Sequence, residues 1–76
     1  MTEHESTAMR INFTRLMQDR EYSVSTRLSL SIHIRKLGRE PGDKIVKELM
    51  SMVESGILEQ EFRNLAQEKY GITMLG

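Results

Sequence analysis

The chain of 76 residues contains no cysteine and no tryptophan, one proline, and only two phenylalanines and two tyrosines. Without cysteine there can be no disulfide framework and no thiolate metal site, which removes two common ways of stabilising a very small domain. No apolar run approaches the length of a transmembrane helix, and the N-terminal residues are acidic and polar, unlike the basic start of a signal peptide. We therefore expect a cytoplasmic protein.

A domain this short buries only about 60% of the surface that its unfolded chain exposes, so its core is thin and self-association would bury more surface. Six methionines favour an adaptable core or interface. Residues 1–8 have no hydrophobic periodicity and predict a disordered tail, followed by a single small domain over residues 9–76.

The formal net charge is zero, which argues against a strongly basic nucleic-acid-binding protein if the chain is taken as a whole. The charges are nevertheless unevenly distributed. Residues 10–44 carry more basic than acidic side chains, mostly arginines, whereas residues 45–76 carry more acidic than basic ones. The first half is therefore the basic half.

A strictly alternating stretch runs from Tyr22 to Arg35, with mainly apolar residues at even positions and serine, arginine and histidine at odd positions. Successive side chains of a strand point to opposite faces, so this pattern predicts a half-buried strand. The competing interpretation is a helix, because Arg35, Lys36 and Leu37 before Gly38 are typical of a helix C-terminus. Wound as a helix, however, the apolar residues spread over more than half the circumference, which favours the strand.

The remaining segments predict an α+β fold: one long strand or β-hairpin over about 9–35, then helices over about 43–55 and 57–70, in a dimer. Residues 39–42 are expected to form a loop, with Asp43 as N-cap of the first helix and Gly56 as its end. In the second helix, Leu58, Phe62 and Leu65 share one stripe. Residues 8–18 are ambiguous between strand and helix.

Enzyme motifs are scarce, and we expect no catalysis, no metal and no cofactor. His4 and His33 are 29 positions apart, without the paired spacing of metal ligands. Gly38 and Gly42 do not build a phosphate-binding loop, and no nucleophile-elbow motif occurs. So small a chain would also have difficulty enclosing a substrate.

The order of strand, loop, Asp43-capped helix, Gly56 and second helix resembles the ribbon-helix-helix DNA-binding proteins over roughly residues 24–70. The resemblance concerns layout; the alternation here is longer than that family's strand. It implies a homodimeric DNA-binding transcriptional regulator that inserts a basic strand face into the groove of double-stranded DNA. The nucleic-acid-binding residues would then be Arg27, Ser29, Ser31, His33, Arg35, Lys36 and Arg39.

Two alternatives remain open. The chain could be a small protein-interaction module, such as an inhibitor, antitoxin or adaptor, that binds another protein and no nucleic acid. It could also be an all-α four-helix domain similar to helix-turn-helix proteins, with Ser23 or Ser25 as N-cap, Gly38 as helix stop, and Arg27, Ser31 and Arg35 along one helical face.

Overall fold

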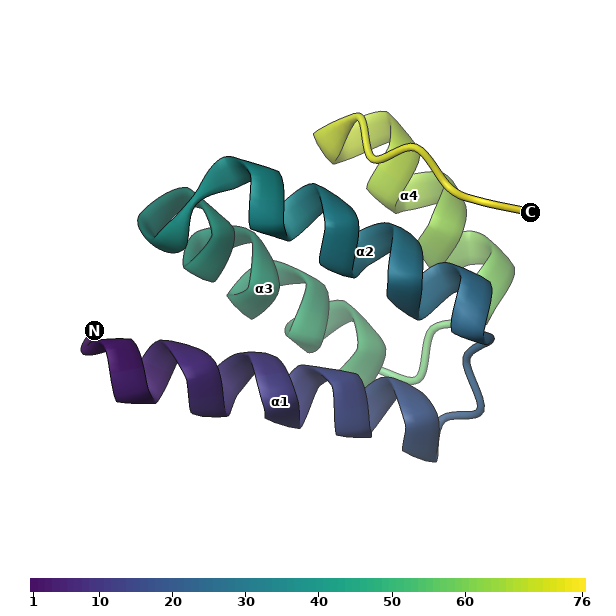
Figure 1. Ribbon diagram of the computed structural model, residues 1–76. Helices are drawn as coiled ribbons and strands as arrows, with labels where there is room; N and C mark the ends of the chain where they lie inside the picture. Colours follow the sequence, from purple (N-terminus) through teal and green to yellow (C-terminus); the bar gives the residue numbers. More distant parts are fainter.

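The computed structural model describes all 76 residues and contains four helices and no strand. α1 spans Glu3–Asp19, α2 Val24–Leu37, α3 Arg39–Glu54 and α4 Glu59–Tyr70. The predicted α+β fold with a strand or hairpin over residues 9–35 is therefore wrong, and the all-α alternative fits. α1, α2 and α4 each pack against α3 (Figure 1).

α1 begins at a complete capping box. The side chain of Thr2 accepts the backbone N–H of Glu5, and the Glu5 carboxylate accepts the backbone N–H of Thr2. Two glutamates in the first turn also favour the positive end of the helix dipole. Residues 3–8, for which the sequence predicts a disordered tail, consequently form the first turns of α1, and Ser6 is buried.

α2 replaces the predicted strand. Ser23 caps its N-terminus by accepting the backbone N–H of Thr26, and Gly38, with φ 87°, ends it. Thr26, Leu30 and Ile34 follow one another at intervals of four residues and face the core. The even-numbered residues of this stretch therefore lie on two different sides of the helix, and not on one face as in a strand. Val24, Leu28 and Ile32 point outward and are exposed.

α3 begins at Arg39, and the predicted loop over residues 39–42 is its first turn. Pro41 is tolerated there because the first N–H groups of a helix have no intrahelical partner. Asp43 is therefore inside the helix and is not its N-cap. A Cβ on Gly42 would lie 3.2 Å from the Ile34 backbone oxygen, so glycine lets α3 approach α2 closely.

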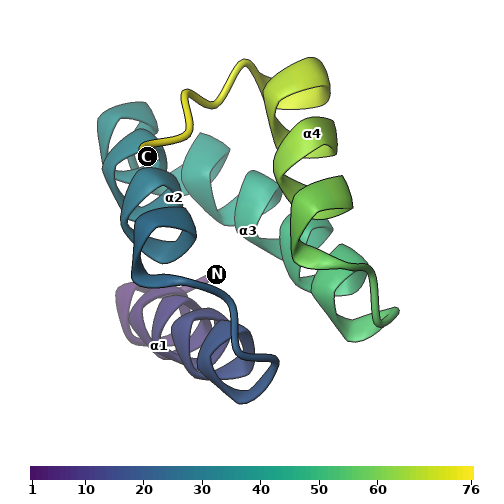
Figure 2. The ribbon, with the colours of Figure 1, turned by 90° about the vertical axis from the view of Figure 1, so that its right-hand side faces the viewer.

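α4 follows a four-residue connection in which Gly56 has φ 84°, and it ends at Gly71 in the left-handed conformation. Phe62 is buried, whereas Leu58 and Leu65 are exposed, so only the Phe62 part of the predicted apolar stripe enters the core. Residues 71–76 return across the molecule to α2 (Figure 2). None of the helices combines the length and apolar character needed to cross a membrane.

The core lies around α3 and receives side chains from every helix. The rings of Tyr22 and Phe62 are 5.3 Å apart at an interplanar angle of 56°, a favourable tilted arrangement. Ile72 from the C-terminal segment closes the core beside α4. The buried apolar residues are Phe13, Met17, Tyr22, Leu30, Ile34, Val46, Leu49, Val53, Phe62, Ala66 and Ile72.

Candidate functional site

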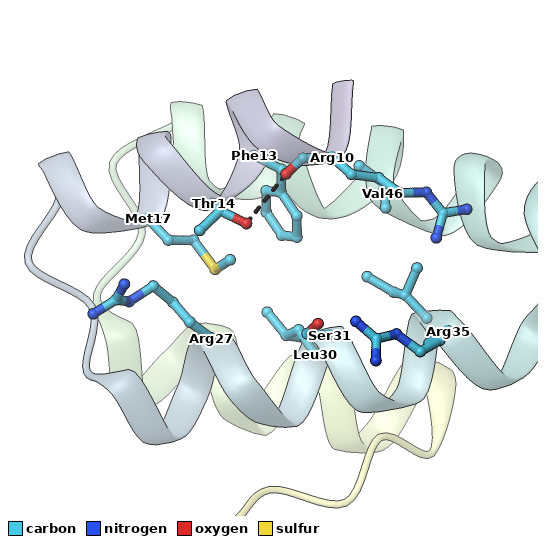
Figure 3. A pocket seen from close by; sticks show the side chains of 10 residues that line it. Arg10, Phe13, Thr14, Met17, Arg27, Leu30, Ser31, Arg35 and Val46 are labelled. Carbon is cyan, nitrogen blue, oxygen red and sulfur yellow. Dashed lines mark hydrogen bonds between the residues drawn. The ribbon is translucent and has the colours of Figure 1, made fainter. Parts of the chain in front are cut away.

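A cleft of about 200 Å³ opens between α1 and α2 (Figure 3). Its floor is apolar and comes from three helices: Phe13 and Met17 of α1, Leu30 and Ile34 of α2, and Val46 of α3. Its rim is polar and carries three guanidinium groups and two hydroxyls, from Arg10, Thr14, Arg27, Ser31 and Arg35. An apolar floor with a few convergent polar groups is the usual composition of a binding site.

Helical spacing explains how these residues meet. Arg27, Ser31 and Arg35 follow one another at intervals of four residues along the edge of α2, and Arg10 and Thr14 do the same along α1. Arg10 and Arg35 lie toward one end of the cleft in Figure 3, and Arg27 lies at the other end with Met17. The two polar edges therefore face each other across the apolar floor.

Arg10 already has a partner within the molecule. Asp43 Oδ1 lies 3.0 Å from Arg10 Nη2 and accepts a 2.6 Å hydrogen bond from the buried Ser6 hydroxyl. The hydrogen bond from Ser6 first, and Arg10 second, hold the pKa of Asp43 below its ordinary value against the opposing effect of burial. These contacts of Ser6, Arg10 and Asp43 join α1 to α3 and position Arg10 at the rim of the cleft.

Arg27 and Arg35, in contrast, have no carboxylate partner. The Arg10–Asp43 pair is the only ion pair in the molecule. The Nε atom of Arg27 is shielded from solvent and has no hydrogen-bond acceptor. A buried donor without an acceptor is unfavourable, so the fold leaves the Arg27 guanidinium incompletely satisfied.

The outward side of α2 extends the cleft rim with aliphatic residues. Val24 is 67% exposed, Leu28 48% and Ile32 43%. Ile32 and Leu28, together with Ser31, Arg35 and Lys36, line a second, shallow depression. We refer to Val24, Arg27, Leu28, Ser31, Ile32 and Arg35 together as the α2 face. It combines an exposed aliphatic row with two unpaired cations, and α2 contains no acidic residue.

A second polar cluster, on the other side of α2, holds the fold together. Glu59 Oε2 of α4 accepts hydrogen bonds from the Ser23 hydroxyl at 2.8 Å and the buried Thr26 hydroxyl at 2.5 Å. Arg63 donates to Thr26 and to the Leu75 carbonyl. Burial alone raises the pKa of Glu59, but the hydroxyl groups and Arg63 outweigh it and lower the pKa overall. The polar side chains of this cluster find their hydrogen-bond partners within the molecule, which indicates a structural role.

The structure divides the predicted nucleic-acid-binding set. Arg27, Ser31 and Arg35 come together on the α2 face. Ser29 does not join them: it is buried, donates to the Ser25 carbonyl and accepts the Leu75 N–H. Lys36 borders the α2 face beside Arg35 and also lines, with His33, a depression beside Leu75. Arg39 lies apart from them as the exposed first residue of α3.

Sequence reasoning missed the α1 side of the cleft, Arg10 and Thr14. The signal was present, because a helix over residues 8–18 places these two beside Phe13 and Met17. No group of histidine and carboxylate side chains is arranged to hold a metal ion. No protein-family model, curated protein or solved structure matches this chain.

Proposed function

We propose that the chain is a protein-interaction module whose α2 face binds an acidic amphipathic helix of a partner. The observation that carries this proposal is the exposed aliphatic row of Val24, Leu28 and Ile32 directly beside Arg27 and Arg35, two arginines without carboxylate partners. An amphipathic helix placed in a groove contributes apolar anchors at intervals of three and four residues. Flanking carboxylates of that helix would pair with the arginines.

The cleft adds a place for one anchor. Its volume of about 200 Å³ suits a single apolar side chain resting on Phe13 and Leu30. Burying an aliphatic side chain completely is worth about 1.5–3 kcal/mol, so the exposed row and the cleft together supply the favourable energy, while the arginines select an acidic partner.

Double-stranded DNA is the second candidate, and Arg27 and Arg35 along one edge of a helix favour it. A phosphate backbone, however, makes no use of an aliphatic row between the cations. Binding of DNA should depend on the arginines alone, whereas binding of a helix should depend on the arginines and on Leu28.

The test uses two labelled probes in fluorescence anisotropy: a designed helical peptide with leucine on one face and glutamate beside it, and a duplex DNA. Leu28→Ser is the test variant, and Ile11→Ser, which removes an equally exposed aliphatic side chain from α1, is the matched control. Leu28→Ser removes about 1 kcal/mol of apolar burial on binding, so it should weaken peptide binding about fivefold, with little effect from Ile11→Ser. Peptide binding that is unaffected by Leu28→Ser would contradict the proposal, and binding of DNA alone would favour the second candidate.

A further inference from the structure

The outer side of α4 is itself an acidic amphipathic surface. Leu58, the N-cap residue of α4, and Leu65 are exposed and seven residues apart, which is close to two helical turns. Glu61 and Glu68, also seven residues apart, are exposed beside them and pair with no cation of the molecule. We refer to these four residues as the α4 face. Its one neighbouring cation, Lys69, lies in the last turn.

The α4 face points away from the α2 of its own chain. Glu59 and Arg63 turn the opposite side of α4 toward Ser23, Thr26 and Leu75. Figure 2 shows α4 and α2 as separate walls of the molecule, bridged by the C-terminal segment. The α2 face and the α4 face are therefore different surfaces of one molecule, and neither can cover the other within a single chain.

The two faces match in spacing as well as in charge. Arg27 and Arg35 are eight residues apart, and the rise of a helix places their backbones about 12 Å apart. Glu61 and Glu68 are seven residues apart, which corresponds to about 10.5 Å. Long flexible side chains absorb this small difference, so both ion pairs can form at once between two adjacent helices. The aliphatic row of α2 then meets the two leucines of α4.

We propose that the α4 face of one copy occupies the α2 face of the next, so that the chain assembles head to tail. This inference rests on the proposed function, because it names a second copy as the acidic helix that the α2 face binds. An interface between two different surfaces is heterologous, and it leaves one free face at each end of the assembly. Association should therefore continue beyond the dimer and weaken with salt, since the pairing charges are exposed.

The test measures mass in solution by light scattering or sedimentation, for the full chain from micromolar to millimolar concentration. One variant carries Arg27→Glu with Arg35→Glu, and the other carries Glu61→Lys with Glu68→Lys. A matched control carries Lys44→Glu with Lys47→Glu, which reverses two exposed lysines of α3. The unmodified chain and the control should form assemblies larger than dimers at low salt, and each test variant alone should be monomeric.

Mixing distinguishes this arrangement from any other. In the mixture of the two test variants, the intact α4 face of the first fits the intact α2 face of the second, and the two charge-reversed faces are complementary to each other as well. The mixture should therefore restore assembly beyond the dimer, with the two variants alternating, and unfolded variants could not produce that result. The milder pair Leu28→Ser and Leu65→Ser, checked for helix content by circular dichroism, should each weaken assembly at least threefold.

An unmodified chain that stays monomeric at millimolar concentration and low salt would overturn the inference, as would an assembly that survives Glu61→Lys with Glu68→Lys. The designed acidic peptide separates the two proposals. If the monomeric chain binds that peptide through Leu28, the proposed function stands and only the second copy is wrong as the partner. If it binds neither the peptide nor itself, both proposals fail.

Discussion

Asp43 is the polar residue whose removal should destabilise the fold most clearly. Its Oδ1 accepts a hydrogen bond from Ser6 at 2.6 Å and contacts Arg10 Nη2 at 3.0 Å, which joins α1 to α3. Asp43→Ala removes both interactions at once. The Ser6 side chain, only 4% exposed, is then left without an acceptor.

The magnitude follows from these contacts. An unsatisfied buried hydroxyl costs about 1–3 kcal/mol, and a hydrogen bond to a charged group contributes about 1.5–3 kcal/mol. Arg10 is partly exposed and keeps its hydrogen bond to the Arg39 carbonyl at 3.2 Å. The stability lost with the Arg10–Asp43 contact therefore lies at or below the low end of that range. Alanine, in return, is the better helix former by roughly 0.5 kcal/mol. We expect a net loss of about 2–3 kcal/mol, which for a domain of this size lowers Tm by roughly 10–20 °C.

The assay is thermal and urea denaturation followed by circular dichroism, with Glu54→Ala as control, since Glu54 is exposed and makes no ion pair. The pH dependence gives a second readout. Because the pKa of Asp43 is lowered in the folded state, its stabilisation is present above the unfolded pKa of about 3.9 and is lost as the pH falls through the folded value. The gap between the unmodified chain and Asp43→Ala should therefore be constant near neutral pH and narrow in acid.

A loss below about 0.5 kcal/mol, equal to that of a typical surface substitution, would refute this reasoning. So would a gap that widens as the pH falls. A double-mutant cycle with Ser6→Ala isolates the hydrogen bond itself, and we expect a coupling energy of about 1 kcal/mol or more between the two sites.

Three further outcomes follow from the same physical arguments. Glu59→Gln should reduce the free energy of unfolding by about 1–2 kcal/mol at neutral pH, measured in urea, because charge-assisted bonds from Ser23 and Thr26 weaken; no change would mean that α4 is held by apolar contacts alone. Burial and the neighbouring Glu48 carboxylate, which accepts a hydrogen bond from the Tyr70 hydroxyl, raise the pKa of Tyr70 to about 12. A spectrophotometric titration should therefore show one tyrosine that ionises only near that pH, and two ordinary transitions would contradict the Tyr70–Glu48 contact. Gly38 has φ 87° and ψ −177°, a backbone region essentially restricted to glycine, so Gly38→Ala should lower stability by about 1–3 kcal/mol in thermal melts, and a neutral effect would show that the turn adapts.

The alternation from Tyr22 to Arg35 explains why the strand prediction was wrong. In α2, every second even-numbered residue of that stretch packs in the core, and the others form the exposed row of the α2 face. The same sequence is therefore compatible with both the two-residue period of a strand and the period of a helix. Gly38 was the informative residue, because its helix-stop signature was correct.

Buried polar residues show what a local pattern could not supply. Thr26 and Ser29 are buried because their partners come from α4 and from the C-terminal segment, far away in the sequence. Asp43 was predicted to cap its own helix, and that prediction was wrong, because the hydrogen bond that Asp43 accepts comes from Ser6 on another helix. The end of α3 just before Gly56 and the end of α4 at Gly71, in contrast, are local features and agree with the predicted helices over about 43–55 and 57–70.

Of the site, the all-α alternative placed Arg27, Ser31 and Arg35 on one helical face, and their spacing does put them on one side of α2. It could not predict the cleft, since that requires knowing that α1 and α2 rest side by side on α3. The opposing edge of Arg10 and Thr14 depends on the same tertiary arrangement.

The most direct test of the α2 face is a titration of the designed acidic amphipathic peptide into the ¹⁵N-labelled protein, with amide chemical shifts recorded for every residue. Binding at the α2 face should concentrate the shift changes on residues 24–35 of α2 and on residues 10–17 of α1, which border the cleft. Changes confined to α4 or to the cluster around Glu59, or no change at saturating peptide, would contradict it.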